Sequence, residues 1–317
     1  MRSSPWLRFA LRRTLTLLLS LWVLVTATFL IMQLVPGDPA RVGLGLSAPK
    51  SQVDARRDAL NLDEPLFTQY TRYIEGALRG DFGESFTAQR PVAEIISERF
   101  PATLKLAVTA FAIALVVGVT LGVATAIATR GGRRRFLADG FSVGSGGLIS
   151  IPEFLLATGL VALFAVGLGW FPVAGQEGFA SYVLPVAALT LPTAAALARL
   201  ARVETLKALD QEYMLVARSK RLPPRRLYMR HLLPNSITAT LTLGGLALGG
   251  LIAGTVIVEN VFAWPGLGSS VAQAILVKDY PLVQGIVLLL GTIALVANTA
   301  VDVVLGLLDP RSLIQES

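Results

Sequence analysis

The chain contains no cysteine and only one histidine, His231. The lack of thiols excludes a disulfide framework and thiolate chemistry, and it leaves the redox compartment undetermined. A single histidine excludes a metal site built from several imidazoles. Charged residues make up only 15% of the 317 residues, whereas hydrophobic residues make up 53%. This balance excludes an ordinary soluble domain and predicts an integral membrane protein.

The sequence also lacks the motifs that would make it an enzyme. The segment 43–50 misses the second glycine of a phosphate-binding loop, and neither a nucleophile elbow nor an HExxH helix is present. We therefore predict that the chain is not an enzyme and binds no cofactor or metal. Its net charge of +7 comes from basic residues beside apolar runs. Such residues orient a chain in the bilayer, and nothing in their pattern predicts a nucleic-acid partner.

Long apolar runs dominate the rest of the chain. A membrane-spanning helix needs about 20 apolar residues. Four uncharged runs reach that length, at 14–35, 106–129, 236–258 and 282–301. Two further spans, at about 141–171 and 180–198, contain Glu153 and two prolines respectively. We predict an all-α fold with six transmembrane helices. The first run exceeds the 7–15 residues of a signal-peptide core, so we interpret it as a retained helix.

Basic residues in the short connectors predict the orientation. Eighteen Lys and Arg residues fall in the N-terminal tail, the connector at 130–135, the segment 199–230 and the C-terminal tail. The opposite connectors, at 172–179 and 259–281, contain only Lys278. Because positive charge stays on the cytoplasmic side, both termini are predicted to be cytoplasmic. The chain would be a multi-pass protein of the bacterial inner membrane.

The segment 36–100 is a polar piece on the predicted outer side. Asp63 is expected to cap a helix that carries Phe67, Tyr70, Tyr73 and Ile74 on one face and ends at Gly80. A second amphipathic run, 92–100, is expected to end at Pro101. This lobe could be a passive lid on the lipid interface or a landing surface for an external partner, and the pattern does not separate the two.

Within the predicted spans, small and ionisable residues are informative. The G-x-x-x-G spacings at 118–122, 245–249 and 250–254 favour close helix packing. An ionisable group at membrane depth costs at least about 2.5 kcal/mol, so each needs a physical reason. Glu153 follows a predicted helix break and is the best candidate to face a cavity. Glu259 could cap a turn or face an aqueous cavity, and the pair Asn298 and Asp302 could hold helices together by i, i+4 contact.

The most informative segment is 210–234, which lies between two membrane-length runs. It predicts a helix at 211–220, a break at Leu222-Pro223-Pro224 and a second helix at 225–233. Tyr213, Met214 and Ala217 would form an apolar stripe. An anchor in the membrane needs only the basic charge, whereas a kinked helix with an apolar stripe suits docking into a partner's groove.

This segment resembles the cytoplasmic EAA loop of binding-protein-dependent ABC importer permeases. Leu215-Val216-Ala217 stands at the EAA triplet and His231-Leu232-Leu233-Pro234 at the I-x-L-P ending. Arg221 stands where the family has glycine, so Pro223-Pro224 could impose the turn instead. The resemblance implies an ATPase-coupling loop over 203–234, with these residues: Leu215, Val216, Ala217, Arg218, Lys220, Arg221, Leu222, Pro223, Arg225, His231 and Pro234.

Further motifs resemble the first permease subunit of the oligopeptide, dipeptide and nickel branch. They cover nearly the whole chain: LVPGDP at 34–39, GDFGES at 80–85, RFPATL at 99–104, LGWFP at 168–172, ENVFAWPGLG at 259–268, DYPLVQG at 279–285 and DPR at 309–311. The resemblance implies a type I, MetI-like permease fold. Its parts would be a tail and first helix at 1–35, an extracytoplasmic lobe at 36–100, a core of five helices at 101–308 and a tail at 309–317.

The resemblance also implies the function and the partners. The chain would import di- or oligopeptides together with a second permease, two cytoplasmic ATPase subunits that bind ATP and Mg²⁺, and an extracytoplasmic solute-binding protein. A nickel or other small-solute importer is the alternative within the family. A stand-alone secondary transporter is the alternative outside it, but the sequence shows neither an internal repeat nor a chain of buried acids and histidines.

Overall fold

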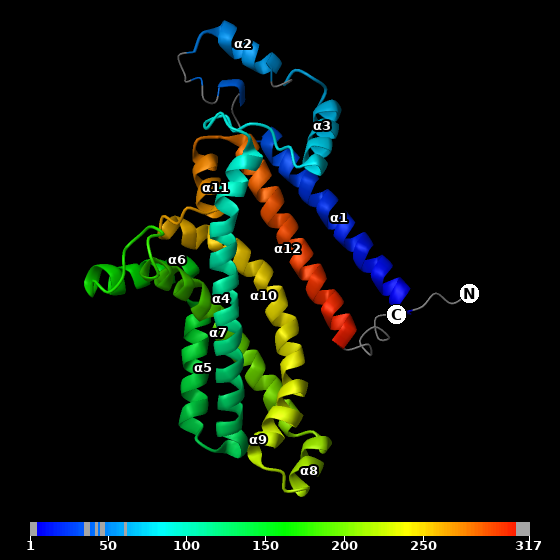
Figure 1. Ribbon diagram of the computed structural model, residues 1–317, viewed down its shortest axis with the longest axis vertical. Coiled ribbons are helices and arrows are strands. Elements are labelled where there is room, and N and C mark those ends of the chain that lie inside the picture. The colour runs from blue at the N-terminus through cyan, green and yellow to red at the C-terminus, as the bar shows by residue number, and fades with distance from the viewer. Residues whose placement is uncertain (1–4, 35–38, 42–43, 45–47, 60–61, 309–317) are drawn as a thin grey trace. The chain divides into compact units, whose positions relative to one another are not determined.

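The computed structural model describes residues 5–34, 39–41, 44, 48–59 and 62–308, and these residues form helices and one isolated bridge, between Glu84 and Pro91 (Figure 1). The motif at 34–39 lies mostly outside them, and the motif at 309–311 lies wholly outside. The helices are α1 (Pro5–Leu34), η1 (Pro39–Arg41), α2 (Lys50–Ala59), α3 (Leu66–Arg79), α4 (Val92–Thr129), η2 (Arg130–Gly132), α5 (Arg135–Ser150), α6 (Glu153–Leu160), η3 (Val161–Gly167), α7 (Ala180–Leu209), α8 (Glu212–Ser219), α9 (Pro224–Arg226), η4 (Leu227–Leu232), α10 (Leu233–Val261), α11 (Leu267–Leu276) and α12 (Tyr280–Leu308).

The chain divides into two compact units. The first comprises residues 1–104 and 263–296, and the second comprises residues 105–262 and 297–317. The predicted lobe falls in the first unit. The predicted coupling loop falls in the second.

Four helical segments are long and apolar enough to cross a membrane, and they lie in α1, α4 with η2, α7 and α12. The predicted span at about 141–171 is not one straight helix, because α5 and the α6–η3 helix meet at an angle of 99°. Pro152 lacks an amide hydrogen and restricts Ile151, which is extended with φ −76° and ψ 122°. With this bent pair as one span the count reaches five, and α10 is a further helix of 29 residues. The number six remains a prediction.

The prediction that the run at 92–100 ends at Pro101 is wrong. Instead α4 runs continuously from Val92 to Thr129 with Pro101 inside it. The missing amide hydrogen of Pro101 leaves the carbonyl of Ser97 without its helical partner. Ser97 is exposed, so water can replace that hydrogen bond and the helix continues.

Glycines in the second unit allow helices to touch through their backbones. A Cβ atom on Gly122 would lie 2.4 Å from the carbonyl oxygen of Ala198, and one on Gly118 would lie 2.8 Å from the Cβ of Leu197. The helices α4 and α7 therefore pack at a distance that only glycine permits. Gly245 of α10 likewise has no room for a Cβ atom, because the side chain of Val301 of α12 lies against it.

In the first unit, tyrosines of α3 pack against α1. Tyr70 and Tyr73 make ring contacts with Phe29, and their hydroxyls lie 2.6 Å from Thr26 Oγ1 and 3.0 Å from Thr28 Oγ1. As predicted, α3 ends at Gly80, which is left-handed with φ 73°.

Two details of the α3 prediction were wrong. The N-cap of α3 is Pro65, whereas Asp63 pairs with Arg57 at 3.3 Å. Phe67 is exposed instead of sharing the packed face of the two tyrosines. Helical spacing alone does not show how far a neighbouring helix extends along a face.

Candidate coupling segment and transmembrane cavity

The segment 210–234 forms a helix, a break and a second helix. The helix α8 ends at Ser219, and Pro223 is extended with φ −62° and ψ 144° before α9 begins. The chain then passes through the π-helix η4 into α10. Pro234 is at the start of α10, where it cannot donate a hydrogen bond to the carbonyl four residues earlier.

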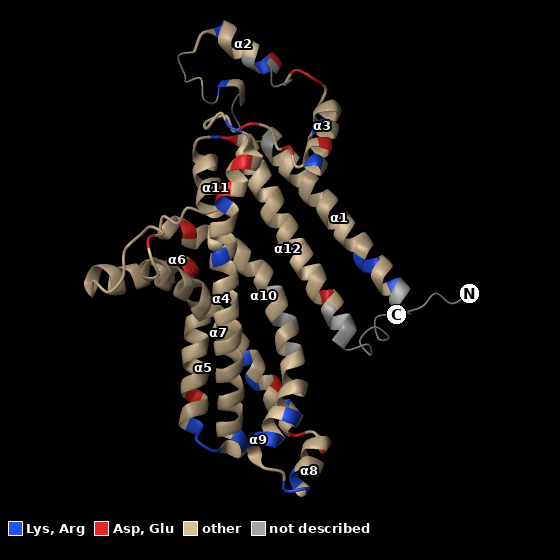
Figure 2. Ribbon diagram, viewed as in Figure 1, with Lys and Arg blue, Asp and Glu red and all other residues tan. Residues whose placement is uncertain are grey.

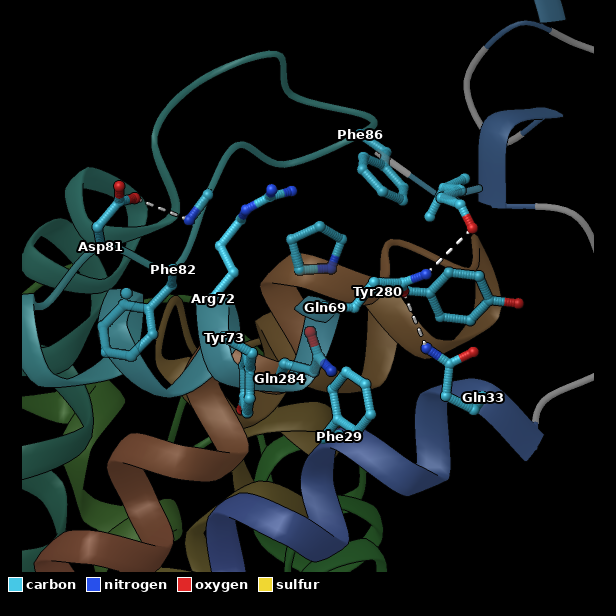
Figure 3. Close-up of a pocket in the computed structure, with 14 residues that line it drawn as sticks. Phe29, Gln33, Gln69, Arg72, Tyr73, Asp81, Phe82, Phe86, Tyr280 and Gln284 are labelled. Atoms are coloured by element: carbon cyan, nitrogen blue, oxygen red, sulfur yellow. Dashed lines mark hydrogen bonds between the residues drawn. The ribbon is translucent and has the colours of Figure 1, made fainter. Parts of the chain in front are cut away.

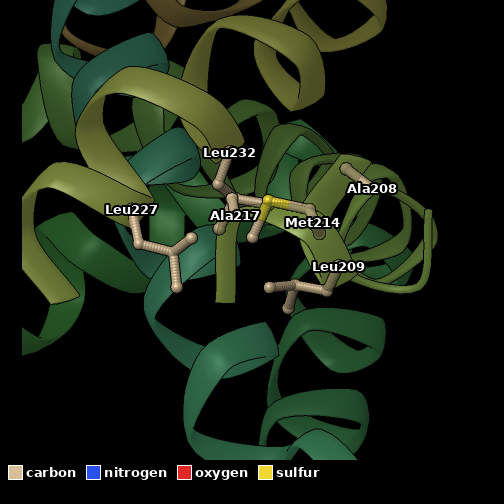
Figure 4. Close-up of a cluster of buried hydrophobic side chains, with 6 residues drawn as sticks. All are labelled: Ala208, Leu209, Met214, Ala217, Leu227 and Leu232. Atoms are coloured by element: carbon tan, nitrogen blue, oxygen red, sulfur yellow. The ribbon is translucent and has the colours of Figure 1, made fainter. Parts of the chain in front are cut away.

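The inner face of α8 is packed against its own chain. Met214 is completely buried and Ala217 nearly so, in a cluster with Ala208, Leu209, Leu227 and Leu232 (Figure 4). The prediction that Met214 and Ala217 belong to an apolar stripe that docks into a partner was therefore wrong. Met214 and Ala217 fasten α8 to the end of α7 and to η4. Leu222 packs partly against the same cluster.

The outer face of α8 carries a different set of apolar residues. Leu215 is 57% exposed and Val216 is 54% exposed. Basic residues follow them in the chain, and Figure 2 shows Lys and Arg gathered on α8, α9 and the connection between α4 and α5. The exposed basic residues of the segment are Lys220, Arg221, Arg225, Arg226 and Arg230, whereas Arg218 is half-buried. We call Leu215, Val216, Arg218 and Lys220 the outer α8 surface.

The turn after α8 keeps the left-handed backbone that a glycine would favour. Arg221 has φ +50°, and its amide donates to the carbonyl of Arg218 over 2.9 Å. A side chain in this region costs roughly 1–2 kcal/mol. The departure from glycine therefore does not remove the tight turn. Pro223 follows the turn and does not replace it.

Arg130 fastens the start of the segment to the end of α4. Its Nη2 donates to the carbonyl of Leu209 over 2.8 Å and pairs with Asp210 Oδ1 at 2.9 Å. The C-terminal end of a helix carries partial negative charge, so a cation there is stabilising. His231 lies half-buried in η4, and its carbonyl accepts from Asn235 Nδ2 over 2.8 Å.

A cavity of about 690 Å³ opens between α5, α6, α7 and α10 in the second unit. Its lining is apolar except for Glu153 and Thr193. The carboxylate of Glu153 lies against Gly254 of α10, where a Cβ atom would come within 2.7 Å of Oε1. Glu153, which the sequence predicts to face a cavity, lines this one.

The other three candidate polar residues lie elsewhere. Glu259 is completely buried near the end of α10 and does not belong to the described lining of this cavity. Asn298 lies on Gly249, where a Cβ atom would be 3.0 Å from its Oδ1. Asp302 is half-buried one helical turn further along α12. The pairing of Asn298 with Asp302 remains a prediction.

Sequence reasoning missed the role of Asp279, which organises a loop in the first unit. Asp279 is fully buried and accepts hydrogen bonds from the amides of Phe86 and Thr87, both at 3.0 Å, and from the hydroxyls of Ser85 and Thr87. Burial raises its pKa, but these hydrogen bonds to the carboxylate outweigh it and hold the pKa below its ordinary value. The loop GDFGES and the motif DYPLVQG are thus joined.

Two other motifs of the first unit also meet. Trp264 is completely buried, and its Nε1 donates to the carbonyl of Ala102 over 3.3 Å. The amide of Leu267 donates to Thr103 Oγ1 over 2.8 Å. Motifs separated by about 160 residues therefore form one structural element, which no local pattern could indicate.

A separate cavity, of about 350 Å³, lies in the first unit (Figure 3). Figure 3 shows side chains of α1, α3, the 80–86 loop and the start of α12 around it. Aromatic rings and three glutamines line it, and Gln33 Nε2 donates to Gln69 Oε1 over 3.4 Å. Arg72, also in the lining, pairs with Glu64 at 2.8 Å.

Comparisons with known proteins agree on one family. The model "Binding-protein-dependent transport system inner membrane component" matches residues 118–313, and "Binding-prot-dependent transport system membrane comp, N-term" matches residues 6–107. The glutathione transport system permease protein GsiC of Escherichia coli (strain K12) is 34% identical over 307 residues, which covers 96% of this chain and 98% of GsiC. A Brucella suis biovar 1 (strain 1330) protein described as a peptide transport system permease is 37% identical over 302 residues, with 91% and 93% covered.

A solved structure supports the fold. A chain of the MetNI methionine ABC transporter, in an inward-facing conformation, has a TM-score of 0.54 at 20% identity and covers 68% of this chain and 96% of that chain. Permeases of this family work with a partner permease, an ATPase and a solute-binding protein, and ATP hydrolysis belongs to the ATPase. The chain therefore belongs to the inner membrane components of binding-protein-dependent transport systems, as a multi-pass permease subunit of an ABC importer.

Proposed function

We propose that this permease imports di- or oligopeptides and forms the translocation path with a second, related permease. Its relatives are described as glutathione and peptide permeases, and glutathione and peptides share amide-linked amino-acid chemistry. Nickel is not favoured, because the described residues contain no group of three or more His, Cys, Asp or Glu that could hold a metal ion. Two cytoplasmic ATPase subunits would bind ATP and Mg²⁺, and an external binding protein would deliver the solute.

The observation that carries the coupling proposal is the division of α8 into two faces. Met214 and Ala217 hold the helix on its own unit, whereas Leu215 and Val216 stay exposed beside Arg218 and Lys220. An exposed apolar pair with cations on its C-terminal side suits a partner groove that has an apolar floor and an acidic rim. We place this surface, both termini and the ATPases on the cytoplasmic side, in line with the eighteen basic residues of those connectors.

Transport would then proceed by alternating access. Closure of the ATP-bound ATPase pair would move the coupling segment, and the packed cluster around Met214 would pass that motion to α7 and, through η4, to α10. The two states of the permease must bind their partners with different free energies for the coupling to work. The lobe at 36–100 would receive the binding protein on the opposite side.

The test places negative charge on the outer α8 surface. Leu215→Glu and Arg218→Glu should lower peptide uptake and peptide-stimulated ATP hydrolysis at least about tenfold, because each places a like charge against an acidic rim. Arg133→Glu, in the exposed connection between α4 and α5, makes the same charge change as Arg218→Glu and serves as the control. Leu222→Glu is a poorer choice because Leu222 also packs against the buried cluster.

The full complex in proteoliposomes provides the measurement, and the amount of variant inserted in the membrane is compared with the unchanged protein. Unchanged uptake in both α8 variants would contradict the coupling role. Uptake of the solute without any ATPase subunit would show a secondary transporter instead.

A further inference from the structure

Glu153 presents a carboxylate to the 690 Å³ cavity, and among the described residues that line this cavity no Lys, Arg or His faces it. The structure records no hydrogen bond or ion pair to this carboxylate within the described part of the chain. Thr193 is the other polar residue of the lining, and its hydroxyl donates to the carbonyl of Leu189 over 2.9 Å. Glu153 is therefore the uncommitted polar group of this wall.

The surroundings explain how a carboxylate can stay in an apolar wall. Glu153 is the first residue of α6, directly after the bend at Pro152. The start of a helix carries partial positive charge, which stabilises an anion there. Gly254 supplies the space on α10, since any larger residue would meet the carboxylate oxygens at 2.7 Å and 2.9 Å. The helix end lowers the cost of the charge but does not neutralise it.

The missing counter-charge must therefore come from outside the described wall. A divalent cation is a poor candidate, because one carboxylate does not make a metal site and no cluster of metal ligands occurs among the described residues. An organic ammonium group fits better, since it needs only one carboxylate and an apolar pocket for the rest of the molecule. The volume lies within the range of about 300–1,000 Å³ that small-molecule sites have.

We infer that Glu153 receives the ammonium group of the transported solute, which for a peptide is its free amino terminus. This inference rests on the proposed function of peptide import. Every unmodified peptide carries that group whatever its sequence, so one carboxylate can serve many solutes. The apolar side chains around it, from α7 and α10, can accept varied residues without demanding a particular one.

Two glycines of α10 provide matched variants. Gly254→Ala displaces the Glu153 carboxylate, which is the flexible end of a side chain, so little else must move. Gly250→Ala adds the same methyl group to the same helix, at a position that lines the cavity, and the new methyl has no atom within 4 Å of it. Glu153→Gln keeps the shape of the side chain and removes its charge.

The experiment measures uptake by the complete transporter in proteoliposomes. The probes are trialanine, N-acetyl-trialanine and an N-acetylated peptide with one lysine, each preloaded to equal occupancy on the binding protein. Glu153→Gln should slow trialanine uptake by on the order of tenfold and leave N-acetyl-trialanine within about twofold of the unchanged complex. Gly254→Ala should lower the ratio of trialanine uptake to N-acetyl-trialanine uptake in the same way, and Gly250→Ala should leave this ratio unchanged.

Each other outcome overturns the inference in a recognisable way. Equal effects of Glu153→Gln on trialanine and N-acetyl-trialanine, or no effect on either, would mean that the carboxylate does not read the amino terminus. A selective loss for the lysine peptide would assign it to side-chain ammonium groups instead. If the unchanged complex transports none of the three peptides, the proposed function itself fails, and the inference fails with it.

Discussion

Arg130 and Asp210 form an ion pair of 2.9 Å, and the same guanidinium nitrogen donates to the carbonyl of Leu209 over 2.8 Å. This contact joins the end of α4 to the point where the coupling segment leaves α7. The carboxylate of Asp210 is 74% exposed, so the ion pair itself contributes little, whereas the bond to the helix end is more sheltered.

Arg130→Ala should therefore cost more than Asp210→Asn. We expect the first change to cost about 1.5–3 kcal/mol, as for a hydrogen bond to a charged group, and the second under about 1 kcal/mol. Thermal unfolding of the purified permease in detergent measures the difference. Equal losses for the two variants would show that the ion pair, and not the carbonyl bond, carries the contact.

Arg221→Gly should stabilise the permease. Arg221 has φ +50°, where glycine has no Cβ penalty, so the gain should be about 1 kcal/mol. The control is Arg218→Gly, which removes the same charge inside α8, where glycine costs about 1 kcal/mol. Opposite shifts of the melting temperature are expected, and a loss in both variants would contradict the strain at residue 221.

Substitutions of Met214 and Val216 should have different effects on the stability of the permease and on its coupling to the ATPase. Met214→Ala opens a cavity in a fully buried cluster and should cost about 2–5 kcal/mol. Val216→Ala removes an exposed side chain and should change stability by under about 0.5 kcal/mol. It should nevertheless lower peptide-stimulated ATP hydrolysis. A destabilised Val216 variant, or one with full coupling, would show that the outer α8 surface is wrongly assigned.

Gly122→Ala should disrupt the contact between α4 and α7. The new methyl group would lie 2.4 Å from the backbone oxygen of Ala198, so the helices must separate, at a cost of several kcal/mol. Gly144→Ala on α5 has open space and should be neutral or raise stability by about 0.5–1 kcal/mol. Folded yield and melting temperature test both, and a tolerated Gly122→Ala would refute the close approach.

Asp279 should make the first unit sensitive to acid. Its pKa is lower in the folded protein than its ordinary value of 3.8, so its stabilisation is complete above that value. The stabilisation is lost as the pH falls through the folded pKa. Asp279→Asn should cost on the order of 2–3 kcal/mol at pH 7 and remove this part of the acid dependence.

Melting curves between pH 7 and pH 3, with limited proteolysis of the 85–87 loop, measure the effect. Glu98→Gln is the control for an exposed carboxylate, since Glu98 also accepts a hydrogen bond, from Arg90 over 2.6 Å, but is not buried. The same acid response in the Asp279→Asn variant as in the unchanged protein would contradict the role of the hydrogen-bonded carboxylate.

Much about this protein followed from local sequence alone. Apolar runs are long because a bilayer demands that each helix satisfy its own backbone, so the membrane class and most spans were predictable. Proline chemistry is equally local, and it placed the bend at Pro152 and the break at Pro223 correctly. Residue order alone also carried the motifs of the family.

Tertiary structure decided the rest, because burial depends on partners distant in the chain. The pattern of α8 showed apolar residues but not that Met214 faces inward while Leu215 and Val216 face outward. Asp279 is an ordinary acid in the sequence until residues 85–87 surround its carboxylate. Even Pro101, the strongest local helix breaker in α4, yields to its surroundings, since an exposed turn can lose one hydrogen bond while the rest of the helix stays packed.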